Sequence, residues 1–431
     1  MVFNVIIYKY TQVLKKGNAI MSNILRENKR WSVILGAVLL QFCLGALYSW
    51  SLFNRPLMEK FSWSESQVVT TYSITIFIFS FSMLLAGRLH DKYGPRIVAT
   101  IGGILYGVGV MLSSIATSLW ALYFYYGIIA GTGVGFAYVC PLTTSVKWFP
   151  NRKGFITGII VGSFGLGSFL FKSLIATLIS SKGVSGAFFY LGIIYMALVL
   201  IGAQFLKTPN EDDLVLIHEK DKKYEKSNTL KKNKVFSSGK DYTVKEVLHT
   251  RSIYVLWFIY LVGCLPGLLV IGIAYDIGID LAHLTPSAAA FTVTVIALFN
   301  TGGRLIWGTI SDYIGRPFSL LLIFILSALS MFSLGMLPLN PVLFFILISC
   351  IAFCFGGIFA TVPPTIADYF GSKNYGSNFS IVAQAYGIAA LLGTTIQTQT
   401  TSLNSTFMIV SCISVVGIIL AVILRKITPG T

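Results

Sequence analysis

Apolar residues fall in long runs along this chain, and short polar segments separate the runs. Each run holds roughly 20 residues, which as a helix is long enough to cross the hydrocarbon of a bilayer. A soluble core cannot use so many segments of this kind, so the pattern predicts an all-α membrane protein with twelve transmembrane helices. The predicted spans are residues 33–53, 67–87, 97–117, 120–142, 155–176, 186–206, 253–274, 288–310, 318–337, 342–364, 378–398 and 405–424.

One segment interrupts this pattern and divides the spans six and six. Residues 207–251 hold eleven basic and eight acidic side chains, a composition typical of a solvated, partly disordered linker. The predicted organisation follows directly from this division. It consists of a cytoplasmic tail (1–32), a six-helix bundle (33–206), a cytoplasmic linker (207–251), a second six-helix bundle (252–424) and a second cytoplasmic tail (425–431).

The two halves repeat each other. The stretch "AGRLHDKYGPR" (86–96) matches "WGTISDYIGR" (307–316) at an offset of 221 residues, and "CPLTTSVKWFPNRKGFITGIIVGSFG" (140–165) matches "VPPTIADYFGSKNYGSNFSIVAQAYG" (362–387) at an offset of 222. Two blocks at nearly the same offset indicate a duplicated six-helix unit. The sequence thus predicts two pseudo-symmetric bundles, a parallel repeat of the kind found in alternating-access transporters.

Composition and charge agree with a membrane protein and orient it. Hydrophobic residues make up 55% of the chain, and the mean hydropathy is +0.77. If both termini are inside, 27 of the 32 Lys and Arg residues lie on the cytoplasmic side, as the positive-inside rule requires. We therefore expect a multi-pass protein of the plasma membrane with both termini cytoplasmic. The formal net charge of +16 reflects topology, so the expected surroundings are the lipid bilayer and no nucleic acid is expected as a partner.

Nothing in the sequence favours an enzyme. The glycine-rich run "GIIAGTGVGFAYVCP" (127–141) lacks the preceding strand and the βαβ unit that a dinucleotide fingerprint needs, and small residues at such spacing let helices pack closely. All six cysteines lie in predicted spans without accompanying histidines, which makes a poor metal site. We expect no cofactor, no metal and no catalytic residue.

The motif that follows the second span of each half, G-x-x-x-D-x-x-G with a basic residue at its end, resembles the signature of the major facilitator superfamily. "LGALYSWSLF" (44–53), the stretch 241–272 and "NTGGRLIWGTISDYIGR" (300–316) resemble the oxalate/formate antiporter family within it, near the monocarboxylate transporters. This resemblance implies the major-facilitator fold and a charge network that locks one conformation; a loop that only sets topology is the alternative. The expected lock residues are Gly87, Arg88, Asp91, Gly94, Arg96, Gly308, Asp312, Gly315 and Arg316, and we expect the basic residues among them to lie within reach of the two aspartates.

Arg304 is the candidate anion site. It precedes Asp312 by eight residues, which places it roughly 12 Å into the eighth helix, and a charge there is costly unless it is paired or hydrated. No Asp or Glu lies in mid-span to pair with it, and its repeat counterpart is Met83. A guanidinium matches a carboxylate bidentately; the alternative is that Arg304 extends to the cytoplasmic interface. The resemblance implies contact with a substrate carboxylate.

Further residues complete the expected site, although packing is the alternative role for each aromatic. Tyr48 and Tyr138 lie in spans 1 and 4 and resemble family positions that enclose substrate, and Phe355 and Phe359 share a face of span 10. Alignment to the family that this chain resembles implies that Tyr386, with Gln384 close by, stands where oxalate-transporting members carry a lysine. One cation instead of two suits a monoanion such as formate, pyruvate or lactate better than oxalate.

Two charged positions leave alternatives open. Lys172 lies near the outer end of span 5, where it can extend to water or contribute to the transport path. Asn300 stands where proton-linked relatives carry an acid, which favours exchange or facilitated transport; Asp276 near the outer mouth leaves proton symport open. The rival functions are transport of another small solute, such as an amino acid or nitrate, and a transport-dead membrane sensor. The fold usually works as a monomer, which we expect here.

Overall fold

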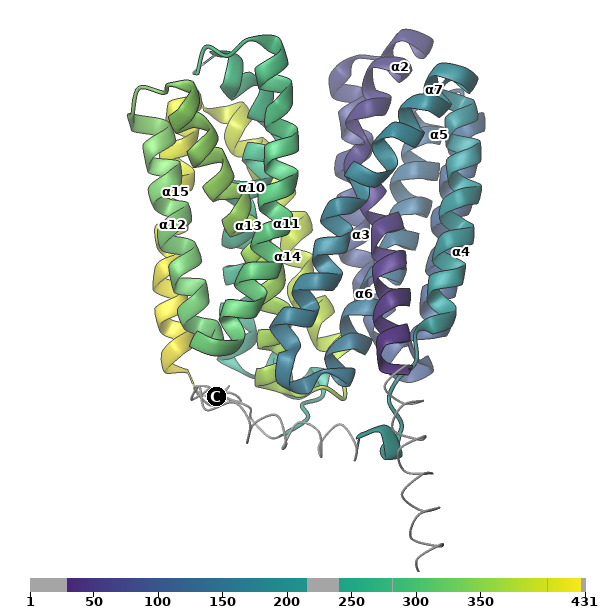
Figure 1. The fold of residues 1–431 in the computed structure, drawn as a ribbon, viewed down its shortest axis with the longest axis vertical. Helices are drawn as coiled ribbons and strands as arrows, with labels where there is room; N and C mark the ends of the chain where they lie inside the picture. The colour runs from purple at the N-terminus through teal and green to yellow at the C-terminus, as the bar shows by residue number, and fades with distance from the viewer. Residues whose placement is uncertain (1–28, 215–239, 281, 401, 428–431) are drawn as a thin grey trace, which may run out of the picture.

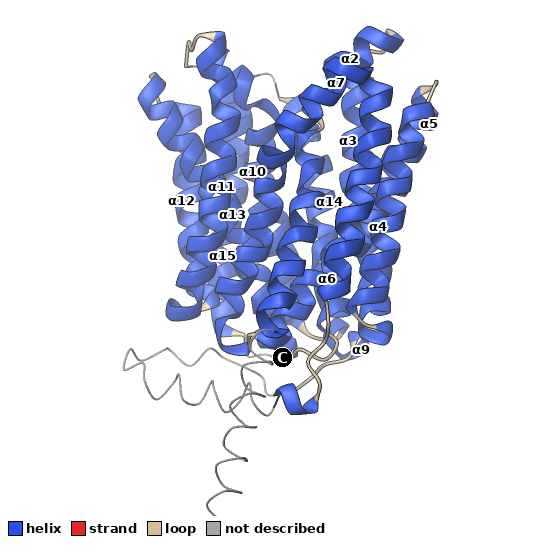
Figure 2. Cartoon of the chain, turned by 45° about the vertical axis from the view of Figure 1, so that its right-hand side comes forward, coloured by secondary structure: helices blue, strands red, loops and turns tan. Residues whose placement is uncertain are grey.

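The computed structural model describes residues 29–214, 240–280, 282–400 and 402–427, and every regular element in these ranges is helical (Figures 1 and 2). The elements in chain order are the helix Lys29–Ser49, α2 (Ser51–Phe61), α3 (Glu65–Tyr93), α4 (Pro95–Leu112), α5 (Leu119–Leu122), the π-helical segment Tyr123–Ala130, α6 (Gly131–Trp148), α7 (Lys153–Phe205), α9 (Val244–Leu248), α10 (Arg251–Asp280), α11 (Pro286–Ile314), α12 (Arg316–Met336), α13 (Pro341–Phe370), α14 (Tyr375–Gln399) and α15 (Leu403–Lys426).

Each predicted span lies largely on helical elements, although 33–53 continues from the helix Lys29–Ser49 into α2, and 120–142 covers α5, the π-helical segment and part of α6. Among the described residues, ten helical segments are long and apolar enough to cross a membrane. One of them, Pro150–Phe205, contains two successive helices, because Gly183 inside α7 has a φ of 69° and breaks the helical path. α11 adds a further helix of 29 residues. The apolar pattern therefore predicted the helices correctly, and the protein is an all-α membrane protein.

The sharp turns after α3 and α11 follow from the repeated motif itself. Gly94 has a φ of 84° and Gly315 a φ of 92°, a left-handed backbone region that glycine adopts without steric cost. A proline stands at the start of each following helix, where its missing N–H costs nothing and its fixed φ suits the first turn. The motif thus carries Asp91 and Asp312 to the ends of their helices.

The helices of the two halves of the chain form two groups, and helix pairs join the groups across a central seam. The groups approach each other at the end where α3 and α11 terminate, called here the motif end, and diverge at the opposite end, the far end (Figures 1 and 2). α3 packs along α14, and α7 packs along α11. Because these pairs come from opposite halves, residues on them can meet across the seam.

The segment between the two halves is described only at its ends. Residues 215–239 of the predicted linker lie outside the described residues. On one side, the Lys29 ammonium donates to Asp213 at 2.6 Å; on the other, the backbone N–H of Tyr242 donates to the carbonyl of Phe370 at 2.9 Å. Both described ends therefore pack at the motif end. α15 runs to Lys426, two residues past the predicted end of the last span.

Candidate functional site

A cavity of about 110 Å³ lies on the seam between the two halves, on the far-end side of Arg304. Its lining is apolar and aromatic apart from hydroxyl and amide groups, which is typical of a small-molecule site. None of the lining residues that the structure describes is an acid. The lining residues are Tyr48, Tyr72, Gly165 and Ser168 from the first half and Leu268, Ile271, Ile296, Ala297, Asn300, Phe355 and Tyr386 from the second.

Arg304 lies directly beneath this cavity and is fully buried (0% exposed). It packs against the cavity lining, since a Cβ added to Gly165 would lie 3.4 Å from its Nη1 atom. Nη1 donates to the backbone carbonyl of Val161. Nε and Nη2, in contrast, have no hydrogen-bond partner among the described residues. A buried donor left unpaired costs about 1–3 kcal/mol, and more when it is charged, so an anion at this place would remove a substantial penalty.

Aromatic rings enclose the guanidinium and the cavity. The Phe359 ring centroid lies 4.9 Å from the guanidinium carbon of Arg304, within the range of a cation–π contact. Phe359 also packs edge-on against Phe355 at 5.0 Å and against Tyr386 at 5.3 Å. The hydroxyl oxygens of Tyr386 and Tyr48 lie 3.1 Å apart, within hydrogen-bond distance across the seam. Four of the predicted aromatic residues are thus brought together with Arg304.

Tyr138 belongs to a second ring cluster on the first half. Its ring packs edge-on against Phe79 at 5.1 Å and against Phe164 at 5.3 Å. Phe164 reaches Tyr48 at 5.0 Å, and Phe79 reaches Tyr386 at 6.3 Å. Tyr138 therefore contacts the cavity through its neighbours. Phe79 and Phe164, like Tyr72 in the lining, could not be predicted from the sequence. Helical spacing alone does not distinguish a ring that faces the cavity from a ring that only packs when the span is apolar on all sides.

Other predicted positions have different outcomes. Gln384 is not brought to the cavity: it is half-buried, and at two residues from Tyr386 it faces the other side of α14. Asn300 lines the cavity, and its buried Oδ1 has no partner among the described residues. Met83, the repeat counterpart of Arg304, is buried. Lys172 is exposed. The side chain of Asp276 lies outside what the structure describes.

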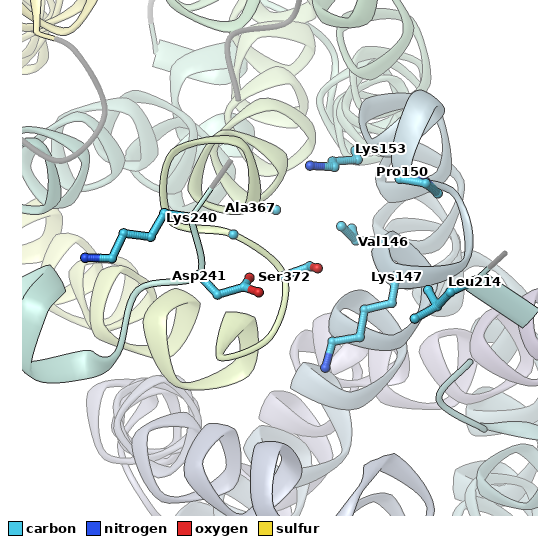
Figure 3. A pocket seen from close by; sticks show the side chains of 10 residues that line it. Val146, Lys147, Pro150, Lys153, Leu214, Lys240, Asp241, Ala367 and Ser372 are labelled. Atoms are coloured by element: carbon cyan, nitrogen blue, oxygen red, sulfur yellow. The ribbon is translucent and has the colours of Figure 1, made fainter. Parts of the chain in front are cut away.

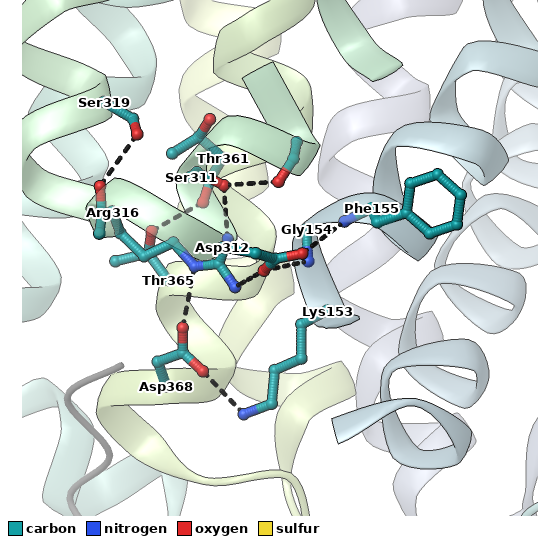
Figure 4. Close-up of polar contacts among 12 residues, drawn as sticks. Lys153, Gly154, Phe155, Ser311, Asp312, Arg316, Ser319, Thr361, Thr365 and Asp368 are labelled. Atoms are coloured by element: carbon teal, nitrogen blue, oxygen red, sulfur yellow. Dashed lines mark hydrogen bonds and ion pairs between the residues drawn. The ribbon is translucent and has the colours of Figure 1, made fainter. Parts of the chain in front are cut away.

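At the motif end, Asp312 joins the two halves (Figure 4). Its carboxylate accepts from the backbone N–H groups of Gly154 and Phe155 at the start of α7, both at 3.0 Å. Arg316 donates to Asp312 at 2.6 Å and to Asp368 at 3.0 Å. A carboxylate at a helix N-terminus satisfies donors that have no partner inside the helix and complements the helix dipole. Asp312 therefore acts as a cap for a helix of the other half.

The network around Arg316 extends back across the seam. Lys153, at the first residue of α7, donates to Asp368 at 2.8 Å. Arg316 and Asp368 are each 3% exposed in their side chains, so this alternating series of charges is shielded from water. Low exposure strengthens each attraction but makes removal of any one member costly. Asp368 and Lys153 were not among the predicted lock residues. Their contact forms only when α13 packs against α7, and no local sequence pattern indicates it.

Asp91 makes the pseudo-symmetric contact. It accepts from the backbone N–H groups of Gly376 at 3.2 Å and Ser377 at 2.7 Å, at the start of α14 in the other half. Gly376 is the repeat counterpart of Gly154, as Asp91 is of Asp312. Each motif aspartate therefore caps the equivalent helix of the opposite bundle, which is a direct consequence of the duplication.

The basic partners differ between the two caps. Arg316 directly follows its motif glycine, whereas Pro95 occupies that place in the first half. Arg96 instead donates to the carbonyl of Gln204 at 2.7 Å within its own half, and Arg88 is exposed. The buried side chain of His90 lies beside Asp91, with Nδ1 3.1 Å from the carboxylate. The expected contact of Arg88 or Arg96 with Asp91 is thus replaced by a histidine contact.

The first glycine of each motif lets the halves approach closely. A Cβ added to Gly308 would lie 2.4 Å from the carbonyl oxygen of Gly154, and one added to Gly87 would lie 2.3 Å from the carbonyl oxygen of Gly376. Real Cβ atoms do not come so near to backbone, so both positions need glycine for as long as the halves are in contact. The second glycines, Gly94 and Gly315, serve the turns.

A second cavity of about 200 Å³ lies at the motif end (Figure 3). Three lysines and Asp241 contribute to it. Lys153 is engaged by Asp368, and Lys240 donates to Glu246 at 2.9 Å. The backbone N–H of Thr243 and the Lys240 ammonium lower the pKa of Glu246 to about 2. Two of the three lysines are thus paired with acids of the protein itself. We therefore interpret this cavity as a space left where α6, α7, α13 and the linker ends meet.

Comparisons with known proteins agree with this architecture. The chain matches the Major Facilitator Superfamily over residues 31–394 and 282–431. The MFS-type transporter YhjX of Escherichia coli is 33% identical, with 85% of this chain and 87% of that protein covered. The oxalate:formate antiporter of Oxalobacter formigenes is 30% identical over 91% of this chain and 90% of its own length. The apicoplast pyruvate carrier 1 of Toxoplasma gondii is 24% identical over 89% and 87%.

Among solved structures, the proton:xylose symporter XylE bound to 6-bromo-6-deoxy-D-glucose has a TM-score of 0.69 at 15% identity and covers 94% of this chain and 97% of its own. At this identity the likeness shows the fold alone. The family match, the two relatives that are at least 30% identical and the helical architecture all indicate a membrane transporter and not an enzyme. The chain is a multi-pass membrane transporter of the Major Facilitator Superfamily, similar to the oxalate:formate antiporter and to monocarboxylate transporters.

Proposed function

We propose that the protein is a secondary transporter of a small organic monoanion such as formate, pyruvate or lactate, and that Arg304 binds the carboxylate. The observation that carries this proposal is a buried guanidinium whose Nε and Nη2 have no partner among the described residues, next to a cavity whose described lining holds no acid. A carboxylate has two acceptor oxygens in a geometry that suits two parallel N–H donors. An internal acid would make such binding unnecessary, and the described lining contains none.

The size and lining of the cavity favour a small substrate. A volume of about 110 Å³ corresponds to roughly four water molecules in the liquid, which suits a molecule of a few non-hydrogen atoms. The ring of Phe359 and the hydroxyls of Tyr48 and Tyr386 supply an apolar wall with polar tips. Tyr386 donates a hydrogen bond but carries no positive charge, which favours a monoanion over oxalate.

Alternating access in this proposal uses the two caps as a lock. Asp91 and Asp312 each hold a helix of the opposite half at the motif end, while the halves diverge toward the far end (Figure 1). We propose that the motif end faces the cytoplasm, with both termini there, in the plasma membrane. Opening toward the cytoplasm then requires both caps to break, and a monomer suffices for this cycle.

Exchange or facilitated transport is the favoured mode. Asn300, one turn from Arg304 on α11, supplies no titratable proton, and the described cavity lining contains neither histidine nor acid. A proton relay needs such groups. The similarity to an oxalate:formate antiporter supports anion exchange as the mode of transport.

Transport by reconstituted protein tests the proposal. Proteoliposomes loaded with unlabelled formate are given labelled formate outside, and pyruvate, lactate, oxalate, nitrate and an amino acid are added as competitors. We expect rapid counterflow that the monocarboxylates inhibit most strongly, and no counterflow by Arg304→Ala. Wild-type counterflow by Arg304→Ala, with equal amounts of inserted protein, would refute the site; uptake of nitrate or an amino acid without any carboxylate would refute the substrate class.

A further inference from the structure

Lys172 lies on the same face of α7 as two residues that line the cavity. It follows Gly165 by seven residues and Ser168 by four, spacings that return to one side of a helix. That side faces α11, because Gly158 and Gly165 of the same stripe pack against Arg304. The lysine therefore continues the cavity-facing stripe toward the far end, where it is exposed.

The two cations lie at opposite ends of the cavity. The carbonyl of Val161 accepts from Arg304, and Lys172 follows Val161 by eleven residues, roughly 16 Å further along the helix. Side chains lean toward the N-terminus of their helix. The N-terminus of α7 is at the motif end, so the side chain of Lys172 leans toward the cavity from the far end. α11 runs in the opposite direction, so the side chain of Arg304 leans toward the cavity from the motif end.

No fixed anion neutralises Lys172 among the described residues. It is exposed, and no hydrogen bond or ion pair joins it to another described side chain. The cavity lining carries no acid, and Glu59, a described acid of the far end, pairs with Arg55 at 3.0 Å. A path with positive charge at its rim and at its base concentrates anions within it.

We propose that Lys172 is the entrance cation of the anion path: it raises the concentration of external organic anions at the cavity mouth, above the Arg304 site. This role rests on the proposed function, because it requires an anionic substrate. The effect of a fixed potential on local concentration is exponential in the charge of the solute. If loss of Lys172 lowers the local concentration of a monoanion by a given factor, it should therefore lower that of a dianion by the square of this factor. A merely structural role would not produce this relation.

Right-side-out proteoliposomes provide the test, with formate uptake measured against external formate and with external oxalate as a competitor. For Lys172→Gln we expect the half-saturating formate concentration to rise about 5-fold and the inhibitory oxalate concentration about 25-fold, with the maximal rate within about 2-fold of wild type. Lys172→Arg should retain both values. Lys182→Gln, the same charge change at the turn beyond the path, is the matched control and should change neither.

The outcomes separate this proposal from the function on which it rests. Anion uptake by Lys172→Gln with unchanged formate and oxalate values refutes the entrance role and leaves the Arg304 site standing. Equal changes for the two anions, or a loss of maximal rate alone, also refute it, because neither follows from an electrostatic potential. If the wild type moves no anion at all, the proposed function fails and the entrance role fails with it.

Discussion

The guanidinium carbon of Arg304 lies 4.9 Å from the centroid of the Phe359 ring. The ring covers one face of the cation, Nη1 donates to the carbonyl of Val161, and the nitrogens Nε and Nη2 have no partner among the described residues. The protein thereby holds a positive charge in an apolar surround without matching it. If Arg304 binds an anion, as proposed, the anion would stabilise this charge, so that anion binding and stability of the site would be linked.

Replacement of Arg304 by lysine separates charge from geometry. Lysine keeps the charge but presents a point donor on a flexible stem in place of a planar fork. We expect Arg304→Lys to weaken formate binding by about 10- to 100-fold, equivalent to about 1.4–2.8 kcal/mol, while Arg304→Ala abolishes it. Tryptophan fluorescence or calorimetric titration with formate checks this order. A lysine variant with wild-type affinity would show that only charge is needed.

The hydroxyl pair Tyr48 and Tyr386 should act as one unit. Their oxygens lie 3.1 Å apart across the seam, and a neutral hydrogen bond contributes about 0.5–1.5 kcal/mol. Tyr48→Phe and Tyr386→Phe should each lower formate affinity by about 3- to 10-fold. The double variant should be no weaker than the weaker single one, since each change already breaks the contact. Additive losses would indicate that each hydroxyl contacts the substrate by itself.

Restoring a cation in α14 should change the preference between anions. Tyr386→Lys places a second positive charge beside the cavity, near Phe359 and on the seam. Two cations favour a dianion, so inhibition of formate counterflow by oxalate should strengthen by about 10-fold or more relative to inhibition by pyruvate. Tyr386→Met, of similar bulk and without charge, is the control. An unchanged ratio of the two inhibition constants would contradict the argument from charge number.

Gly308 should be intolerant of even one methyl group when the motif end is closed. Its Cβ would lie 2.4 Å from the carbonyl of Gly154, whereas a Cβ on Gly302 of the same helix has nothing within 4 Å. Gly308→Ala should therefore shift the population toward a state with the motif end open, and Gly302→Ala should not. Labelling of a single cysteine placed at the motif end with an impermeant thiol reagent, in an otherwise cysteine-free protein, measures this opening. Equal labelling of the two variants would exclude the seam contact as a closure device.

The two caps should differ in strength. Asp312 holds α7 and also neutralises the buried Arg316, while Asp91 holds α14 beside a histidine. An asparagine retains an acceptor oxygen but leaves Asp368 as the one described carboxylate paired with Arg316, and breaking a buried pair costs about 3–5 kcal/mol. We expect Asp312→Asn to lower the thermal stability in detergent clearly more than Asp91→Asn. The reverse order would mean that Asp368 compensates fully for the lost charge.

The sequence by itself determined the helices and the internal repeat that relates the two halves. Runs of apolar residues predicted every long helix, because a bilayer span has a required length and composition. The repeat predicted two related halves, and Gly94 and Gly315 predicted the turns, since few other residues adopt their backbone conformation. Arg304 was singled out because a charge inside an apolar run is costly unless it is paired or hydrated, and its role as the anion site stays a prediction. Gln384 was proposed from proximity in sequence, and on α14 it faces the other side from Tyr386, which lines the cavity.

Only the tertiary structure decided which groups meet across the seam. Asp312 and Gly154 lie 158 residues apart, and nothing local in either segment encodes their contact. His90 replaces the expected arginine beside Asp91 because a proline in the N-terminal motif moves Arg96 away toward Gln204. Phe79, Phe164 and Tyr72 resemble any other ring in an apolar span until the neighbouring helices are placed. Packing between helices that are distant in sequence decides which of these side chains meet. Helical periodicity describes one helix at a time and cannot predict such contacts.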